Sequence, residues 1–496
     1  MSDLLYAVNA IAQPMNFLIL VAGVTLGLLS GATPGVSGTM MVVLLIPLTY
    51  SLEPDAAFLL LCSVYCSAVF SGSISAILFR TPGAPEAVAT SLDGYPMAQG
   101  GQAPLALGIS VFSSATGGLV GTLLLMAIAP QLAKVALKFG PPEYFALAVL
   151  GLSVITVMGA NNLIKSFLAA GFGLFLATVG IDAMTGVARF TFGVTGLMGG
   201  IDFIPVLIGL FAVSEVLRRF MGDLTVREKM ARVSSRLPDL KMMRTLAGTI
   251  ARSSLIGTAI GILPGIGATT ASIVSYSEAM RWSKTPEKFG TGHSEGIAAP
   301  ESANNAAANG AMVPLLALGI PGSATTAVML GAFILHGVKP GPLMFTEQSH
   351  LVHTIFAGLF LCNFLILIIS KPFISAFANI IRIPYYFLGP VILLLCIIGS
   401  FAIRNNVLDI WLTMLFGFVG YVMEKHQFPL APVILGLVLG GLAEQELRRS
   451  LIVSGGDWGV FFQSPISAVL LLAAAVSVVL SLVSLLRKKK QTAADA

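Results

Sequence analysis

Apolar runs, separated by short polar or glycine- and proline-rich stretches, recur along the whole chain. A helix needs roughly 20 apolar residues to cross a hydrocarbon core about 30 Å thick. The runs therefore predict an all-α polytopic integral membrane protein with about 10–14 segments that enter or cross the bilayer. The segments lie near 16–31, 38–50, 56–79, 105–129, 143–159, 163–180, 201–217, 246–263, 267–280, 311–335, 351–370, 384–402, 406–422, 430–442 and 464–486.

Composition supports a membrane protein. Of the 496 residues, 56% are hydrophobic and 10% are charged, whereas a soluble domain carries about 25% charged residues. The first Lys or Arg is Arg80. The basic start of a cleavable signal peptide is therefore missing, and we expect the first apolar segment to remain in the mature protein. All four cysteines lie in apolar runs, where packed, reduced thiols are more typical than disulfides or a metal site.

One strongly basic connection divides the chain. Residues 218–244 contain eight Lys or Arg side chains against three carboxylates, and basic residues that flank membrane segments favour the cytoplasmic side. The sequence predicts a first half at 1–217, a basic cytoplasmic linker at 218–244, a second half at 245–486 and a basic cytoplasmic tail at 487–496. The first 79 residues contain no Lys or Arg, so we place the N-terminus outside.

The two halves carry the same motif on either side of the linker. Gly27-x3-Gly31-x2-Pro34-Gly35-Val36-Ser37-Gly38-Thr39 matches Gly257-x3-Gly261-x2-Pro264-Gly265-Ile266-Gly267-Ala268-Thr269 at an offset of 230 positions. A second Pro-Gly pair follows in each half, at Pro82-Gly83 and Pro321-Gly322. Basic residues flank 246–280, which should enter the bilayer as a hairpin from the cytoplasm, whereas 16–50 should enter from outside. We therefore predict two inverted repeats, the usual architecture of alternating-access carriers.

Each Pro-Gly pair should interrupt a helix inside the membrane, because proline removes a backbone N–H and glycine allows conformations closed to other residues. The helix that follows then starts with free N–H groups at the positive end of its dipole, which is a site for anions. The structural alternative is a simple kink packed with small residues. We predict that the substrate-binding residues are Gly35, Ser37, Gly38, Thr39, Gly83, Gly265, Gly267, Thr269, Thr270, Gly322, Ser323 and Thr325.

A second candidate site lies at 295–310, which is too polar to face lipid. Glu301, Asn304 and Asn305 share one helical turn there. A carboxylate with amide oxygens suits a hard monovalent cation, and Glu301 could instead carry a proton. The alternative is a solvated loop or a polar helix cap. Arg80, directly before the second Pro-Gly pair, is a candidate counter-charge for an anionic substrate or an interfacial anchor.

Two runs of sequence resemble a known family. Phe289-Gly-Thr-Gly-x-x-Glu295-Gly-x-Ala-Ala-Pro-Glu301-x-x-Asn304-Asn305-Ala and Leu318-Gly-Ile-Pro321-Gly-Ser are similar to the large membrane subunit of the tripartite tricarboxylate transporters. The resemblance implies a bacterial inner-membrane secondary carrier for citrate-like tricarboxylates or other organic carboxylates, driven by Na⁺ or H⁺ and without another cofactor. It also implies two partners, a small membrane subunit and a periplasmic solute-binding protein.

Other functions remain as alternatives. Gly35-Val36-Ser37-Gly38 resembles the Gly-x-Ser-Gly of rhomboid intramembrane serine proteases, but the second repeat has Gly267 in place of Ser37, and a nucleophilic serine needs a base. A passive anion channel is a third reading. The chain has no Gly-x4-Gly-Lys-Ser/Thr motif, so transport driven by ATP is not expected. Glu347, His350 and His353 share a helical face, which is more typical of an interfacial polar cluster than of a metal site.

Overall fold

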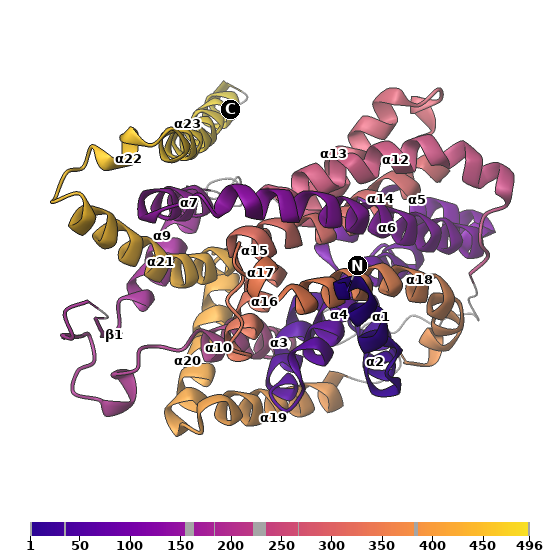
Figure 1. The fold of residues 1–496 in the computed structure, drawn as a ribbon. Coiled ribbons are helices and arrows are strands. Elements are labelled where there is room, and N and C mark those ends of the chain that lie inside the picture. Colours follow the sequence, from indigo (N-terminus) through magenta and orange to yellow (C-terminus); the bar gives the residue numbers. More distant parts are fainter. Residues whose placement is uncertain are drawn as a thin grey trace. The chain divides into compact units, whose positions relative to one another are not determined.

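The computed structural model describes residues 2–33, 36–153, 163–182, 184–221, 235–265, 267–380 and 385–494, which are almost entirely helical (Figure 1). Within these ranges the strands are β1 (Gly180–Ile181) and β2 (Ala188–Arg189), which pair antiparallel. Six described helical spans are long and apolar enough to cross a membrane: Pro14–Ala32, Pro54–Phe79, Pro85–Ala136, Leu240–Ile262, Ser349–Ala376 and Val407–Lys425. Shorter apolar helices accompany them. The prediction of an all-α polytopic membrane protein is confirmed.

The chain folds into two compact units, each described here by itself. Unit 1 comprises Met1–Ala133 and Arg218–Leu395, and unit 2 comprises Lys134–Leu217 and Cys396–Ala496. Each predicted half of the sequence thus gives its first part to unit 1 and its last part to unit 2. This order is what a duplicated sequence would produce, while the division at 217 and 245 stays a prediction.

Unit 1 holds the four Pro-Gly pairs of the repeats. Its elements are α1 (Ser2–Ala12), α2 (Pro14–Ala32), α3 (Gly38–Thr49), α4 (Pro54–Phe79), η1 (Pro85–Ala87), α5 (Val88–Met97), η2 (Ala98–Gln102), α6 (Ala103–Ala136), α12 (Leu240–Ile262), α13 (Gly267–Trp282), η5 (Pro286–Lys288), α14 (Ser294–Gly310), α15 (Met312–Leu318), α16 (Ala324–Leu335), α17 (Met344–Glu347) and α18 (Ser349–Ile380). The last residues of α6 lie in unit 2.

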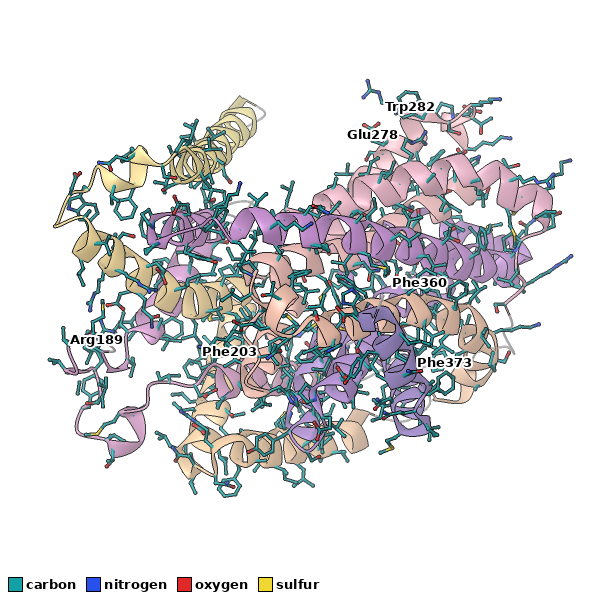
Figure 2. All side chains as sticks on the ribbon, in the orientation of Figure 1. Arg189, Phe203, Glu278, Trp282, Phe360 and Phe373 are labelled. Carbon is teal, nitrogen blue, oxygen red and sulfur yellow. The ribbon has the colours of Figure 1, made fainter. Side chains whose placement is uncertain are left out.

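Unit 2 is built from the remaining elements. These are α7 (Pro141–Ser153), α9 (Leu163–Ala177), β1, β2, η3 (Thr195–Leu197), α10 (Phe203–Leu207), η4 (Ile208–Val213), α11 (Ser214–Phe220), α19 (Tyr385–Arg404), α20 (Val407–Lys425), α21 (Ala431–Val453), α22 (Val460–Gln463) and α23 (Pro465–Ala494), of which α11 and α19 extend into unit 1. Close glycine contacts join α9 to α21, at Gly173 and Gly436. Arg189, the last residue of β2, is labelled in Figure 2. It pairs with Glu444 at 2.6 Å and with Asp182 at 3.2 Å.

The Gly-x3-Gly part of the repeated motif is explained by helix packing in unit 1. A Cβ atom on Gly27 would collide with the backbone of Val64, and one on Gly31 would collide with the backbone of Ala68, so α2 lies directly against α4. In the second half, Gly257 and Gly261 bring α12 equally close to the backbone of α14. Small residues allow this approach, which maximises dispersion contacts where lipid offers no hydrophobic drive between helices.

The contacts in the two halves correspond residue by residue. Gly257 packs on Ala303 as Gly27 packs on Val64. An offset of 239 relates Ala303 to Val64, and the same offset relates Pro321 to Pro82. Helices α14 and α15 together are therefore the counterpart of α4. The internal repeat thus extends from the sequence to the packing of the helices.

These glycine contacts predict a stability effect. Gly261→Val should destabilise the folded protein by about 1–3 kcal/mol or more, because the new side chain would overlap the backbone of Ala307. The matched control is Gly248→Val on the same helix, where a Cβ atom meets nothing within 4 Å. The midpoint of thermal unfolding in detergent should fall for the first variant and stay near wild type for the second. Equal midpoints would contradict the close approach of α12 and α14.

The segment 246–280 forms the expected hairpin. Helix α13 folds back along α12, and the two lie side by side (Figure 1). The guanidinium of Arg252 on α12 lies 5.5 Å from the ring centroid of Trp282 at the end of α13. Trp282 also donates a hydrogen bond to Glu278 at 3.1 Å, at the end of α13 remote from the Pro-Gly pair (Figure 2).

Candidate functional site

None of the described helices runs through a Pro-Gly pair. Helix α2 ends at Ala32 and α3 begins at Gly38, while α4 ends at Phe79 before η1 and α5. In the second half the interruptions lie between α12 and α13 and between α15 and α16. Pro34 and Gly35 lie outside the described residues. A helix break is therefore present at three of the pairs, and at the first the described residues on either side end one helix and begin the next. We refer to the four positions as breaks 1 to 4 in chain order.

The four breaks lie close to one another within unit 1. The amide of Gly265 in break 3 donates to the carbonyl of Gly322 in break 4 at 2.8 Å. The hydroxyls of Thr39 and Thr325, which follow breaks 1 and 4, lie 2.7 Å apart. In break 2, a Cβ atom on Gly83 would collide with the carbonyl oxygen of Gly31, just before break 1. Residues from both repeats thus converge on one place.

Helix α3 starts directly after break 1, and helix α16 starts directly after break 4, at the place where the breaks meet. The Ser37 hydroxyl accepts a hydrogen bond from the Met40 amide at 3.1 Å and so caps α3. Ser323 caps α16, because it exchanges reciprocal hydrogen bonds with Thr326. Such caps satisfy one or two of the four N–H groups that every helix start leaves without an intrahelical partner. The others at each start can be satisfied by an anion.

The other predicted substrate residues differ in exposure. Gly83, Gly38, Gly267 and Thr269 are partly buried, Gly265, Gly322 and Thr325 are buried, and Thr270 is exposed. Gly265 and Gly267 have φ values of 78° and 73°, a region in which side chains other than glycine are strained. Break 3 therefore depends on glycine for its backbone conformation. The role of these residues in substrate binding stays a prediction.

Glu301 lies fully buried in α14, and hydroxyl groups surround its carboxylate. One oxygen accepts from Ser114 at 2.7 Å and from Ser110 at 3.2 Å, both on α6. The other accepts from Thr90 on α5 and from the Asn304 amide at 3.4 Å. A buried carboxylate would be costly without such donors. Helices from both repeats thus position Glu301.

The two neighbouring asparagines belong to the same cluster. The Asn305 amide nitrogen donates to the Asn304 side-chain oxygen at 2.9 Å. The side-chain oxygen of Asn305 is buried and accepts no hydrogen bond from the residues that the structure describes. The structure therefore brings together the three residues predicted for the coupling ion and leaves one hard oxygen acceptor among them. Whether a cation binds there stays a prediction.

The sequence analysis missed the partners of these residues. Nothing in the sequence marked Thr90, Ser110 and Ser114, since hydroxyl residues are frequent throughout these glycine-rich helices. Asp93 was also missed. One of its oxygens accepts from the amides of Gly290, Gly292 and His293 at 2.9, 2.9 and 2.7 Å, and the other accepts from the Tyr276 hydroxyl at 2.8 Å. The Phe289-Gly-Thr-Gly run was a signal for this tight loop.

Arg80 ends α4 in a left-handed conformation with φ 56°. Its side chain is exposed, and the guanidinium lies 5.9 Å from the ring centroid of Tyr95. Its role as a counter-charge stays a prediction. His350 and His353 lie 3.6 and 4.0 Å from the Asp3 carboxylate. Among the described residues, no three His, Cys, Asp or Glu side chains are grouped as metal ligands.

Comparisons with known proteins agree with this architecture. Residues 17–435 match the model of the tripartite tricarboxylate transporter TctA family. The chain is 39% identical over 489 residues to an uncharacterized 52.8 kDa protein in the TAR-I ttuC' 3' region of Agrobacterium vitis, which covers 99% of this chain and 97% of that protein. It is 43% identical over 234 residues to an uncharacterized protein in the TAR-II ttuC' 3' region of the same organism, over 47% of this chain and 97% of the relative.

No solved structure matches the chain. The family match covers most of the sequence, including all four helix breaks and the Glu301 cluster. The chain therefore belongs to the tripartite tricarboxylate transporter TctA family.

Proposed function

We propose that this transporter is the large permease subunit of a secondary active carrier that imports an organic anion of the tricarboxylate or dicarboxylate type, using a Na⁺ or H⁺ gradient. The single observation that supports this most is the convergence of four helix breaks from both repeats in unit 1. Irregular backbone at membrane depth is tolerated only where it is buried in protein or lines a cavity. Substrate sites between inverted repeats have this construction in other carriers.

In this proposal the substrate carboxylates bind the helix starts at the breaks, through backbone N–H groups and nearby hydroxyls. The residues involved would be Ser37, Gly38, Thr39, Thr269 and Thr270, the glycines of the breaks, and Ser323 and Thr325, with Arg80 as a nearby counter-charge. The contact between Thr39 and Thr325 supports this, because it brings the two repeats together where their helices start. A movement of one repeat against the other would then open and close the site.

The coupling ion would bind near Glu301, Asn304 and Asn305. Sodium prefers hard oxygen ligands, and the unpaired Asn305 side-chain oxygen supplies one beside the carboxylate cluster. A proton could instead bind the Glu301 carboxyl, because the surrounding hydroxyls can rotate from donating to accepting. Either ion would neutralise the buried negative charge of the Glu301 carboxylate.

The partners proposed are a small membrane subunit and a periplasmic solute-binding protein, as the family description implies. The chain would lie in the bacterial inner membrane, with its N-terminus in the periplasm and its C-terminal tail in the cytoplasm. A rhomboid-like protease is the weaker candidate. The Ser37 hydroxyl caps α3, and among the described residues no histidine donates to it or accepts from it.

The proposal is tested by uptake into proteoliposomes that contain the large and small subunits, with the cognate binding protein added outside. Labelled citrate and a panel of other organic acids are supplied with an inward Na⁺ gradient, with an inward proton gradient, or with neither. Concentrative uptake of a carboxylate that requires one gradient supports the proposal. Equilibration without any gradient would indicate a passive channel, and lack of uptake for every acid tested would contradict a carboxylate carrier.

A first prediction concerns Glu301. Glu301→Gln should lower gradient-driven uptake at least about tenfold, because the neutral amide cannot hold a cation as the carboxylate does and brings an N–H donor toward Thr90, Ser110 or Ser114. The initial rate of uptake is measured against the concentration of Na⁺ and against pH. Ser114→Ala serves as the matched variant, since it removes one donor and keeps the charge. Unchanged ion dependence in Glu301→Gln would exclude Glu301 from the ion site.

A further inference from the structure

Break 2 contains a carboxylate with one buried oxygen that accepts no hydrogen bond from the described residues. Glu86 lies in η1, four residues after Pro82, and is partly buried. Its Oε2 atom is buried and accepts no hydrogen bond from the described residues. No described Lys or Arg side chain forms an ion pair with Glu86. Glu301, in contrast, accepts hydrogen bonds at both carboxylate oxygens.

The internal repeat shows where Glu86 lies relative to the helix breaks. An offset of 239 relates Pro82 to Pro321 and therefore Glu86 to Thr325. Thr325 contacts Thr39 across the repeats, and the counterpart of Thr39 is Thr269 in α13. Consistent with this symmetry, η1 packs against α13. Glu86 is therefore the sequence counterpart of Thr325, and it lies on an element that packs against the helix that begins near Thr269.

Arg80, the charged residue directly before break 2, forms no ion pair with Glu86 in the part of the chain that the structure describes. The Tyr65 hydroxyl on α4 lies 3.3 Å from that of Ser323 in break 4. Arg80 is exposed over Tyr95. On α5, α13 and α14, Asp93, Tyr276 and Glu301 are hydrogen-bonded to one another or to hydroxyls and amides. Glu295, at the start of α14, accepts from Thr249 at 3.2 Å through one oxygen, and its other oxygen is buried and accepts nothing from the described residues.

A negative charge on Glu86 would repel the proposed anionic substrate, because like charges repel strongly in a low-dielectric interior. A buried carboxylate oxygen without a hydrogen-bond donor favours binding a proton or a cation. We propose that the Glu86 carboxylate binds a coupling cation, a proton or Na⁺, whose charge permits a carboxylate substrate to occupy the adjoining helix breaks. This inference rests on the proposed function and adds a cation site beside the substrate, separate from the cluster around Glu301.

The mechanism makes cation and substrate binding reciprocal. With Glu86 charged, the anion is repelled, and with Glu86 neutralised, the anion binds the helix starts. By linkage, the bound anion raises the affinity for the cation by the same factor. A transporter that carries its substrate only together with the cation is thereby coupled to the gradient. Coupling between two sites is typically about 5- to 150-fold in affinity.

The test uses the purified full chain in detergent, with citrate as the anion probe. Citrate affinity is measured in NaCl or in choline chloride of equal ionic strength, at alkaline and at acidic pH. Wild type should bind citrate about 5- to 150-fold more tightly with Na⁺ or at acidic pH. Glu86→Gln, which resembles the neutralised state, should bind citrate more tightly than wild type in choline chloride at alkaline pH and should keep only the smaller cation dependence that the Glu301 cluster contributes. Cation dependence as large as that of wild type in Glu86→Gln would overturn the inference.

Two variants control for charge and folding. Glu86→Asp keeps the negative charge, so its citrate binding should still depend on the cation. If Glu86 had only a structural role, Glu86→Asp and Glu86→Gln would not differ in this dependence. Glu278→Gln removes a carboxylate at the far end of α13, where Glu278 contacts Trp282 (Figure 2), and should behave as wild type. Loss of citrate binding in Glu86→Gln with an unchanged melting temperature would also overturn the inference.

A second measurement needs no substrate. The midpoint of thermal unfolding is followed as choline is replaced by Na⁺ and as the pH is lowered. Glu86→Gln should lose part of the cation-dependent stabilisation that wild type shows, and Glu301→Gln should lose another part. Equal stabilisation in wild type and Glu86→Gln would exclude the cation site. If the stabilisation depends on Glu86 but no organic acid is transported, the cation site stands and the proposed function fails.

Discussion

Gly322→Val is expected to reduce substrate uptake at least about 100-fold, while the protein still inserts into the membrane. A Cβ atom on Gly322 would lie 2.8 Å from both the Cα and the carbonyl oxygen of Ala311, so valine must push break 4 away from the end of α14. The carbonyl of Gly322, which accepts from the Gly265 amide, would move with it. Uptake by proteoliposomes and the yield of membrane-inserted protein are the measurements.

Two other glycines serve as controls for this prediction. Gly100→Val should transport as wild type, because a Cβ atom there meets nothing within 4 Å and φ is ordinary. Gly267→Ala tests backbone conformation without collision, since Gly267 has φ 73° in open space, and left-handed alanine costs about 1–2 kcal/mol. It should lower uptake less than Gly322→Val does. If Gly322→Val took up substrate at the wild-type rate, the breaks would serve only to let the helices pack and would not take part in substrate binding.

The breaks themselves could be predicted from the sequence because proline and glycine act locally. The contacts that the breaks make with one another could not be predicted from the sequence. Thr39 and Thr325 are 286 positions apart, and nothing in either tripeptide around them specifies the other. In a membrane protein, apolar runs show that a helix is present, but they do not show which helix it packs on, because the lipid-facing and the packed surfaces are equally apolar.

The Gly-x3-Gly pattern was the exception, because glycines one turn apart on a helix favour close packing on another helix. The sequence analysis used this pattern to find the repeat. The structure adds that Gly257 and Gly261 contact Ala303 and Ala307 as Gly27 and Gly31 contact Val64 and Ala68. The offset of 239 also makes Thr325 the counterpart of Glu86.

For the site, the sequence identified the charged residue Glu301 but not its ligands. Polarity inside an apolar chain marks the carboxylate, whereas the serine and threonine donors around it are ordinary in these helices. The division into compact units was also missed, since both halves contribute to each unit. Insertion of the repeats from opposite faces stays a prediction, because it depends on the charge of the connecting loops rather than on packing.

Asp93→Ala is expected to give the largest loss of stability among the polar substitutions, about 3–5 kcal/mol, because each buried donor left without an acceptor costs about 1–3 kcal/mol. The change removes the acceptor for three buried or partly buried amides and for the Tyr276 hydroxyl. These amides belong to the loop directly before α14, so its start and the position of Glu301 would loosen together. The melting temperature and the protease sensitivity of the loop at 283–293 are the measurements.

Two milder variants separate the contributions at Asp93. Tyr276→Phe removes one hydrogen bond and should cost about 1 kcal/mol. Asp93→Asn keeps the shape and one carbonyl oxygen for the loop amides, so its cost should lie between those of Tyr276→Phe and Asp93→Ala. If the melting temperature of Asp93→Ala equalled that of the wild type, the glycines alone would hold the loop in its conformation. If Asn and Ala were equally damaging, the negative charge rather than the geometry would hold the loop, because a neutral oxygen in the same place would then contribute nothing.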